Sequence, residues 1–344
     1  MANATKTVKS SGGDYTSLNA ALAGQAANLT TNCAGTGGAG ILTIECYSMS
    51  DTTAANTGTG YTTSASYYIN ITVPTAERHD GKWNTAKYRI NYSSEGGDAL
   101  TIAANYTRVT GIQASQNGTY KTRRAIRSSN CVGVILDSCI GRIAGTNGAE
   151  SNAFLLSSST TYSYKVVNCI AINPLNIGFS FGEGASPTAT VYNCTAISCA
   201  TYGFYGYSGR ALLKNCVAHS CGTSDFNSGM GATGSTNNAS EDGSAPNTNE
   251  VSLNGIDLTD IFVDAANGDY HLVVDSPLIN VGADLHSDTY AANTSLASSL
   301  DIDGETRSGT WDIGADEYVS EEPEPEVVAS SIFRGSIMNS FIVR

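Results

Sequence analysis

The sequence has little charge, few prolines and few tryptophans, and it contains no long apolar run. Of 344 residues, 14% are charged, 7 are proline and 2 are tryptophan. No stretch approaches the roughly 20 consecutive apolar residues that a membrane-spanning helix needs, so we expect no membrane span. The hydrophobic fraction of 41% is large enough for a sizeable core, which excludes a wholly disordered chain. The 36 glycines argue against a helical bundle and favour strands and turns.

Basic residues are also scarce. Lys and Arg number 18 against 31 Asp and Glu, a net charge of −13, which argues against nucleic acid as a partner because that binding needs clustered cations. The one dense basic run is expected to be a solvated loop or strand edge; it comprises Lys121, Arg123, Arg124 and Arg127. Residues 1–6 lead into no apolar segment, so the sequence predicts no secretory signal peptide and folding in a reducing cytoplasm.

The cysteine pattern differs from that of a disulfide framework. The count of nine is odd, and four of the cysteines follow Asn or Ser within apolar runs: Cys139, Cys169, Cys194 and Cys216. A thiol in this setting behaves as a small hydrophobic side chain, so we expect buried free thiols within strands. Disulfide pairing and metal binding are the alternatives.

An internal repeat is the strongest signal in the chain. Three segments, at 167–172, 192–197 and 214–219, share an Asn-Cys pair followed by a small residue two positions later. A phenylalanine follows each Asn by 11 residues, and the Asn-Cys pair advances by 25 and then 22 residues. A weaker copy lies at 136–141 and a fainter one at 108–112.

This period predicts an all-β protein, a right-handed parallel β-helix in which each repeat forms one coil. Equivalent residues of successive coils should stack, with Cys and Phe inside and Asn at the bends, where it tolerates left-handed backbone angles. We expect the structural ladder to consist of Asn168, Asn193, Asn215, Cys169, Cys194, Cys216, Phe179, Phe204 and Phe226.

The remaining segments predict a cap, appendages and a linker. A strand, a Gly-Gly turn and a helix from about Thr16, with Leu18, Ala21 and Leu22 on one face, would cover the exposed N-terminal edge of the stack. Strands are predicted at 41–47 and 67–73, with a loop at 50–66 between them. The predicted organisation is an N-terminal cap (1–29), a β-helix body (30–318) with its clearest coils at 131–227, a long loop at 228–252 and C-terminal coils at 253–318, an acidic Pro-containing linker (319–329) and an apolar anchor peptide (330–344).

The C-terminal motifs carry a family resemblance. The order D-Y-H-L at 269–272, S-P-x-I-x-x-G at 276–282, D-x-D-G-x-x-R at 301–307 and D-I-G-A-x-E-Y at 312–318 resembles the C-terminal region of large parallel β-helix proteins of the pectate-lyase-like superfamily. With the S-G-G-D-Y-T-S-L segment at 11–18 and the Asn-Cys coils, the resemblance spans residues 7–318. It implies the fold and leaves the activity open, because lyases, hydrolases, adhesins and phage tailspikes share it.

The segment 330–344 differs in composition from the linker before it. The linker carries four glutamates and two prolines, whereas the segment is apolar and lightly basic. A disordered tail is one interpretation; docking onto another subunit or back onto its own body is the other, because so many apolar residues need a cover. The anchor residues we nominate are Ile332, Phe333, Ile337, Met338, Phe341 and Ile342.

The sequence nominates no catalytic residue, cofactor or metal ligand. No acidic residues recur at coil spacing, as a paired-carboxylate glycosidase would need on one face. Asp225 replaces a glycine of the repeat and is expected to serve a turn, and His219 is either a wet edge residue or a base. The Asp301-x-Asp303-Gly304 segment is expected to form a turn, with Arg307 paired to Asp312 or Glu317, and ion binding there is left open.

We therefore expect a non-enzymatic structural or interaction protein. The layout is similar to phage-associated β-helix appendages, so the predicted role is a bacteriophage virion component, a capsid decoration or tail-associated appendage, made in the host cytoplasm and displayed on the virion surface. Its partners would be other virion or assembly subunits, bound through residues 330–344. The alternatives are a polysaccharide lyase or hydrolase (a depolymerase), and an adhesin that binds surface glycans through Tyr202, Tyr205 and Tyr207.

Overall fold

The structure is a computed structural model. It describes residues 2–119, 122–145, 150–157, 163–182, 189–207, 209, 211–246, 248–286 and 300–320. Strands dominate this part of the chain, and the longest helix is α1 (Leu18–Gly24). Four short 3-10 turns complete the helical content: η1 (Cys33–Gly35), η2 (Thr75–Glu77), η3 (Leu258–Asp260) and η4 (Ala265–Asn267).

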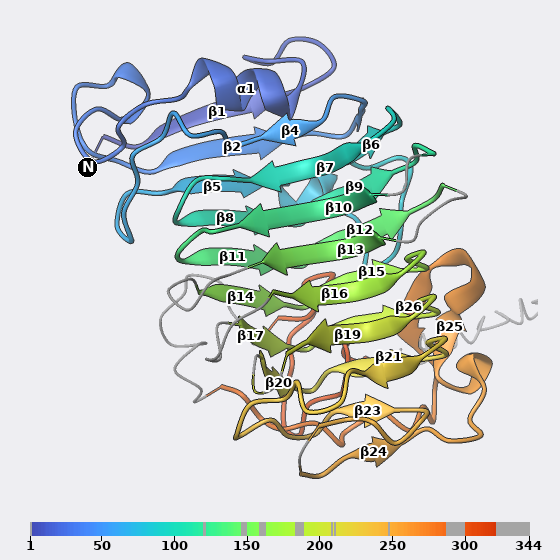
Figure 1. Cartoon of the computed structure of the whole chain (residues 1–344). Helices are drawn as coiled ribbons and strands as arrows, with labels where there is room; N and C mark the ends of the chain where they lie inside the picture. Colours follow the sequence, from blue (N-terminus) through green and yellow to red (C-terminus); the bar gives the residue numbers. More distant parts are fainter. Residues whose placement is uncertain are drawn as a thin grey trace, which may run out of the picture.

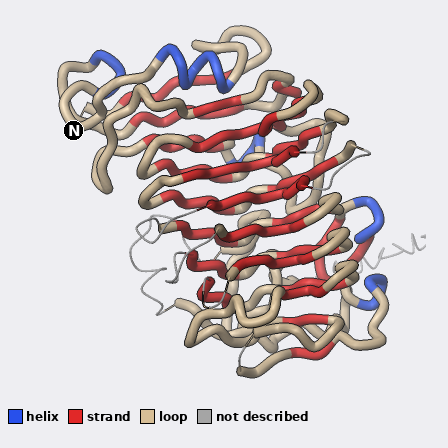
Figure 2. Tube along the Cα trace, viewed as in Figure 1, coloured by secondary structure: helices blue, strands red, loops and turns tan. Residues whose placement is uncertain are grey.

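Three parallel sheets run the length of the body (Figure 1, Figure 2). The first sheet contains β1 (Ala4–Val8), β2 (Leu42–Cys46), β5 (Ile69–Thr72), β8 (Thr107–Thr110), β11 (Val134–Asp137), β14 (Tyr164–Val167), β17 (Ala189–Tyr192) and β20 (Ala211–Lys214). The second sheet contains β3 (Ser50–Asp51), β6 (Arg89–Tyr92), β9 (Gln113–Gln116), β12 (Ile140–Ile143), β15 (Ile170–Ile172), β18 (Thr195–Ile197), β21 (Val217–His219), β23 (Ala239–Ser240) and β24 (Val251–Ser252). The third sheet contains β4 (Ala55–Asn56), β7 (Gly97–Ile102), β10 (Thr122–Ser129), β13 (Glu150–Ser157), β16 (Ile177–Phe181), β19 (Tyr202–Gly206) and β22 (Ser224–Phe226).

Each coil visits the three sheets in turn, and equivalent residues pair in register. In the first sheet Val166 pairs with Val191, and in the second sheet Ala171 pairs with Ala196. All the pairings within these three sheets are parallel, which is the arrangement that the 22–25-residue repeat predicts. The prediction of an all-β protein with a parallel β-helix fold is confirmed.

The interior is filled by matched columns of large and small side chains. Gly141 of β12 pairs with Ala171 of β15, and a Cβ atom at Gly141 would lie 2.8 Å from the Phe154 ring. The second sheet therefore offers small residues where the third sheet offers phenylalanines. Such large-against-small pairing fills a narrow coil without voids.

The N-terminal cap forms as the sequence predicts. Ser17 ends an extended segment, and its Oγ accepts a hydrogen bond from the Ala20 amide at 3.2 Å, which caps α1. Leu18, Ala21 and Leu22 are buried beneath the helix. Figure 1 shows α1 lying across the end of the stack above β1 and β4, where it covers the first coil.

Two segments predicted as loops contribute strands. The 50–66 segment contains β3 and β4, and the 228–252 segment contains β23 and β24. In the 228–252 segment, Asn237 adopts a left-handed φ of 51° and Ala239 pairs with Val217. The corner asparagine of the repeat is therefore kept in this coil, although Asn238 stands where the earlier coils have cysteine. The two-residue strands are too short for an alternating pattern to be visible in the sequence.

The predicted C-terminal coils at 253–318 differ from the structure. Among the described residues, the chain after β24 adds no strand to the three sheets, and β25 (Phe262–Asp264) pairs with β26 (Asp269–Leu272) in an antiparallel ribbon. We call residues 253–286 and 300–320 the C-terminal clasp. The clasp packs over the outer face of the second sheet, where it buries Ile170, Ile172, Ile197 and Val217. These outward-facing residues need an apolar cover, which a further coil at the end of the stack would not provide.

The basic run also differs from expectation. Arg123, Arg124 and Arg127 lie in β10, an interior strand between β7 and β13. Arg123 is fully buried, with its guanidinium hydrogen-bonded to the Gly118 carbonyl, and Arg124 and Arg127 contact Asp98 at 3.6 and 3.3 Å. The buried Asp98 carboxylate on the neighbouring coil offsets the charges of Arg124 and Arg127.

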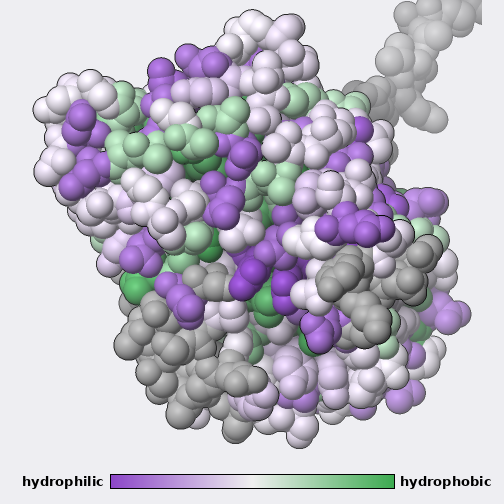
Figure 3. Space-filling model, turned by 45° about the horizontal axis from the view of Figure 1, so that its top comes forward, coloured by the Kyte–Doolittle hydropathy of each residue, from purple (hydrophilic) through white to green (hydrophobic). Residues whose placement is uncertain are grey.

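The surface mixes polar and apolar residues. On the face shown in Figure 3, hydrophilic and hydrophobic side chains alternate in small patches. Among the described residues, no helix has the length and apolar character that crossing a membrane would require.

We predict that the Phe204→Ala variant is strongly destabilised. Phe204 is fully buried and stacked on both sides, so truncation leaves a cavity that costs about 3–5 kcal/mol. Denaturant unfolding monitored by circular dichroism measures the loss. The control is Tyr207→Ser, at a side chain that is 47% exposed, which should change stability by about 0.5 kcal/mol or less. Equal losses in the two variants would contradict the role of the stack.

Candidate functional site

The asparagines of the ladder occupy the corner between the first and second sheets. Asn168, Asn193 and Asn215 have φ values of 51°, 52° and 54°, in the left-handed region that asparagine tolerates better than most residues. Asn193 Nδ2 donates to Asn168 Oδ1 at 3.3 Å, and Asn215 Nδ2 donates to Asn193 Oδ1 at 3.1 Å. The side chains therefore form a continuous hydrogen-bonded row along the stack.

The cysteines follow directly at the same corner, between strands rather than within them. Cys169 Sγ lies 3.2 Å from the Val167 carbonyl and Cys194 Sγ lies 3.3 Å from the Tyr192 carbonyl. Burial raises the pKa of both thiols well above the ordinary value, so they stay protonated. Cys216 Sγ lies 3.3 Å from the Val191 carbonyl. All nine cysteines are free, and these three are fully buried, as expected for packing residues.

The phenylalanines stack face to face along the third sheet. Ring centroids are 5.0 Å apart for Phe179 and Phe204 and 4.8 Å apart for Phe204 and Phe226, and both pairs of rings are inclined by 7°. Phe154 continues the column at 4.6 Å from Phe179. Phe154 is absent from the predicted ladder because it follows Cys139 by 15 residues, whereas the later coils separate Cys and Phe by 10.

The asparagine row also binds the C-terminal clasp, a role that the repeat does not predict. Asn168 Nδ2 donates to the Leu300 carbonyl at 2.9 Å. Asn215 Nδ2 donates to the Ala283 carbonyl at 2.9 Å, and the Ala283 amide donates back to Asn215 Oδ1 at 2.7 Å. Asn168 and Asn215 therefore bind both the clasp and Asn193, which lies between them in the row.

Arg307 lies at the centre of the clasp. Its side chain is fully buried, and its guanidinium donates to Glu317 Oε2 at 3.0 Å and to the carbonyls of Gly314 and Ala315 at 3.0 and 2.8 Å. The predicted pairing of Arg307 with Glu317 is confirmed. Asp301 Oδ1 accepts hydrogen bonds from the amides of residues 303, 304 and 305, as a turn-forming aspartate does.

A histidine of the clasp lies between two carboxylates, one of which also contacts an early coil. His271 Nδ1 lies 2.5 Å from Asp269 Oδ1, and its Nε2 lies 3.3 Å from Asp303 Oδ2. Lys82, far away in sequence, contacts Asp269 at 3.0 Å. The hydrogen bond to Asp303 raises the pKa of His271 to about 10, so the imidazole is charged at neutral pH.

The same cluster has the composition of a cation site. One ligand atom each from His271, Asp303 and Asp316 lies within 4.8 Å of the others, and Asp301, Asp303 and Glu305 form a second such group. However, both His271 nitrogens already face carboxylates, and the Asp301 oxygens already accept amide hydrogen bonds. The geometry therefore fits an ionic lock better than a metal centre.

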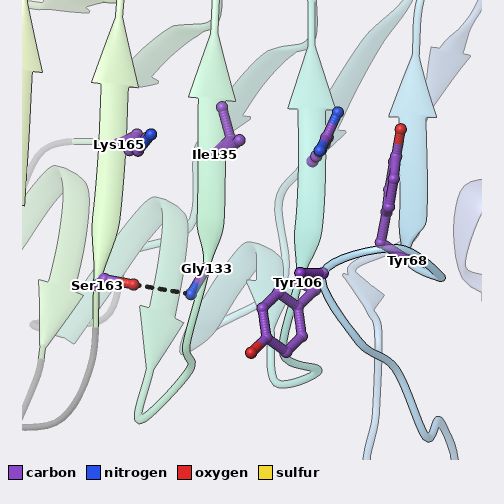
Figure 4. A pocket seen from close by; sticks show the side chains of 8 residues that line it. Tyr68, Tyr106, Gly133, Ile135, Ser163 and Lys165 are labelled. Carbon is purple, nitrogen blue, oxygen red and sulfur yellow. Dashed lines mark hydrogen bonds between the residues drawn. The ribbon is translucent and has the colours of Figure 1, made fainter. Parts of the chain in front are cut away.

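A hollow of about 190 Å³ lies on the outer face of the first sheet. Figure 4 shows Tyr68 and Tyr106 at one side, on neighbouring coils, and Lys165 at the other side, beyond the coil that carries Ile135. The Arg108 guanidinium lies 3.8 Å from the centroid of the Tyr68 ring. Gly133, at φ 69°, is required here because a Cβ atom would lie 2.6 Å from the Tyr106 ring. Aromatic faces beside cations are typical of surfaces that bind sugars bearing negative charge.

The three tyrosines nominated for sugar stacking lie together at β19. The Tyr202 and Tyr205 rings are 5.1 Å apart, and those of Tyr205 and Tyr207 are 6.3 Å apart with an edge-to-face inclination. Tyr202 also borders a hollow of about 490 Å³ lined by hydroxyl-bearing and glycine residues. The cluster thus packs against itself and presents Tyr207 outward.

The other residues weighed in the sequence have structural contacts. Asp225 was expected to serve a turn, but it lies in β22, and its Oδ2 accepts a hydrogen bond from the Glu241 amide at 2.7 Å, which joins β22 to the segment after β23. His219 is buried, and its nitrogens face the Ser220 hydroxyl at 2.8 Å and the Ile256 carbonyl at 3.0 Å. The six anchor residues lie outside the described part of the chain: Ile332, Phe333, Ile337, Met338, Phe341 and Ile342.

The chain was compared with protein-family models and with curated proteins. No protein-family model matches it, and no curated protein matches it significantly. The class that the fold defines is a parallel β-helix protein with an ionically locked C-terminal clasp.

We predict that stability falls between pH 6.5 and 8 and that His271 contributes to the fall. The folded-state pKa of about 10 exceeds the unfolded value near 6.5, so the stabilisation is complete below pH 6.5 and is lost as pH rises through 10. One proton gives a slope of at most about 1.4 kcal/mol per pH unit. Urea unfolding at several pH values measures it, and His271→Gln should flatten the slope.

The matched control for this prediction is His286→Gln. His286 lies in the same clasp, but its side chain is 46% exposed. This variant should keep the slope of the parent chain. An unchanged slope in His271→Gln would show that the cluster does not hold the proton that we assign to it.

Proposed function

We propose that this chain is a non-enzymatic structural and interaction protein, a virion component of a bacteriophage that is attached through residues 330–344. The observation that supports it most is the combination of a long, laddered coil stack with an apolar segment separated from it by an acidic linker. Stacked in-register coils make a body that resists bending, which suits a protein that displays a surface. The sequence resemblance to the pectate-lyase-like superfamily and to phage appendages supports the same role.

Removal of the anchor segment should weaken attachment strongly. We expect the full-length chain to co-sediment with assembled particles, and a chain ending at Glu326 to bind at least tenfold more weakly, a loss of about 1.4 kcal/mol. Phe341→Asp should weaken binding, whereas Ser340→Asp, which adds the same charge next to it, should weaken it less. Equal association of full-length and shortened chains, or association of neither, would contradict the anchor.

The hollow on the first sheet favours a second function, the binding of a glycan that carries carboxylates. Its support is the Tyr68–Arg108 stack, with Lys165 two strands further along the same sheet face. A sugar ring could stack on the tyrosines while its carboxylate faces the cations. This role is compatible with a virion appendage, because such a surface would meet the glycans of a host.

Substitution of the two cations should reduce binding to acidic polysaccharides. We expect Arg108→Gln and Lys165→Gln each to lower the affinity for a uronate-containing polymer about three- to tenfold, as loss of one ordinary hydrogen bond does. The control is Lys9→Gln, which removes a cation lying 4.0 Å from the Tyr47 ring, outside the hollow. Unchanged affinity in the hollow variants would contradict the site. New reducing ends or unsaturated products in the same assay would indicate a depolymerase instead.

A further inference from the structure

An apolar groove lies in the C-terminal clasp where the described chain ends. It has a volume of about 630 Å³, and three of its lining residues are strongly exposed valines: Val263 (57%), Val274 (66%) and Val319 (52%). The described part of the chain has five exposed large hydrophobic side chains, and the three most exposed of them line this one groove. An apolar patch of this kind marks a binding surface.

The rim of the groove is acidic. Asp303, Glu305, Asp316 and Glu317 line it; Asp303 is paired with His271 and Glu317 with Arg307, and Glu305 is exposed. His271 also lines it, but its charge is matched by Asp269 and Asp303. The groove therefore favours a ligand that is apolar and carries positive charge, and it disfavours an acidic one.

The segment 330–344 has these properties. It contains two arginines, Arg334 and Arg344, and no acidic residue, whereas the linker before it carries four glutamates. Phe333, Ile337 and Phe341 are spaced by four residues, which places them on one face of a helix, and Met338 and Ile342 lie beside that face. An amphipathic helix laid in an apolar groove is a common mode of peptide recognition.

We propose that residues 330–344 dock in the groove of their own chain, with the aromatic and aliphatic face against the three valines and Arg334 beside Glu305. The ten residues 320–329 extend to at most about 35 Å, which is ample because Val319 itself lines the groove. Binding within one chain takes place at millimolar effective concentration, well above that of a second copy in dilute solution.

This inference deepens the proposed function, because it says where the anchor segment lies before a particle binds it. The groove holds the apolar face out of water, and a particle subunit with a better-fitting surface takes the segment from it. Docking can be tested by hydrogen exchange without any particle present. A negative exchange result would therefore not contradict attachment to particles, and a failure to attach to particles would not contradict docking.

Hydrogen exchange of the full-length chain tests the docking. The amides of residues 330–344 should exchange at least tenfold more slowly than in the isolated peptide 330–344. Val274→Asp places a charge in the groove at an exposed position, so the fold is retained and the protection should be lost. The matched control is Tyr207→Asp, which replaces another exposed apolar residue outside the groove and should leave the protection unchanged.

A charge reversal provides the second arm. Glu305→Lys should reduce the protection about threefold or more, and the double variant Glu305→Lys with Arg334→Glu should restore it. Exchange of the segment at the peptide rate in the parent chain would overturn the proposal, as would protection that Val274→Asp and Glu305→Lys leave unchanged. Protection that appears only with a dimer at high protein concentration would overturn docking within one chain.

Discussion

The parallel, in-register pairing of successive coils constrains almost every other feature of the molecule. Neighbouring strands are about 4.8 Å apart, so each side chain in a coil lies beside its equivalent in the next. Like charges in such columns would repel, whereas asparagine amides hydrogen-bond and phenylalanine rings stack. The low charge content and the repeated Asn, Cys and Phe are therefore consequences of one geometry. Arg124 and Arg127 are compatible with it because Asp98 lies on the adjacent coil.

The C-terminal clasp covers apolar side chains that the coils alone would leave exposed to water. The second sheet presents isoleucines and a valine on its outer face as well as small residues inside, so a bare stack would expose an apolar stripe. The clasp covers that stripe and bonds to the asparagine corner. Arg307 and Glu317 organise it from within, and Asp269, which flanks His271, joins it to Lys82 on an early coil.

The sequence predicted the coils better than the clasp, for physical reasons. The coil signal repeats, so Asn193 and its equivalents at 168 and 215 are recognisable from spacing alone. The motifs at 269–272 and 312–318 occur once, and their place over the second sheet depends on contacts far apart in sequence, such as Ala315 with Thr195. Short strands such as β23 had no periodicity to reveal them. The hollow at Tyr68 and Arg108 joins residues from separate coils outside the clear repeats, so no motif marks it.

The double hydrogen bonding of the asparagine corner has a consequence for how the molecule comes apart. A plain solenoid can lose its coils one at a time from either end, because each coil contacts only its neighbours. Here the clasp contacts several coils along the stack, through Lys82, Asn168, Asn215 and Asn237. It therefore links coils that do not contact one another directly. For one coil to unfold alone, the clasp would have to detach from the remaining coils as well. The coil stack should therefore unfold as one cooperative unit. The force needed to unfold it would depend on all the coils that the clasp contacts, and not on the least stable coil alone.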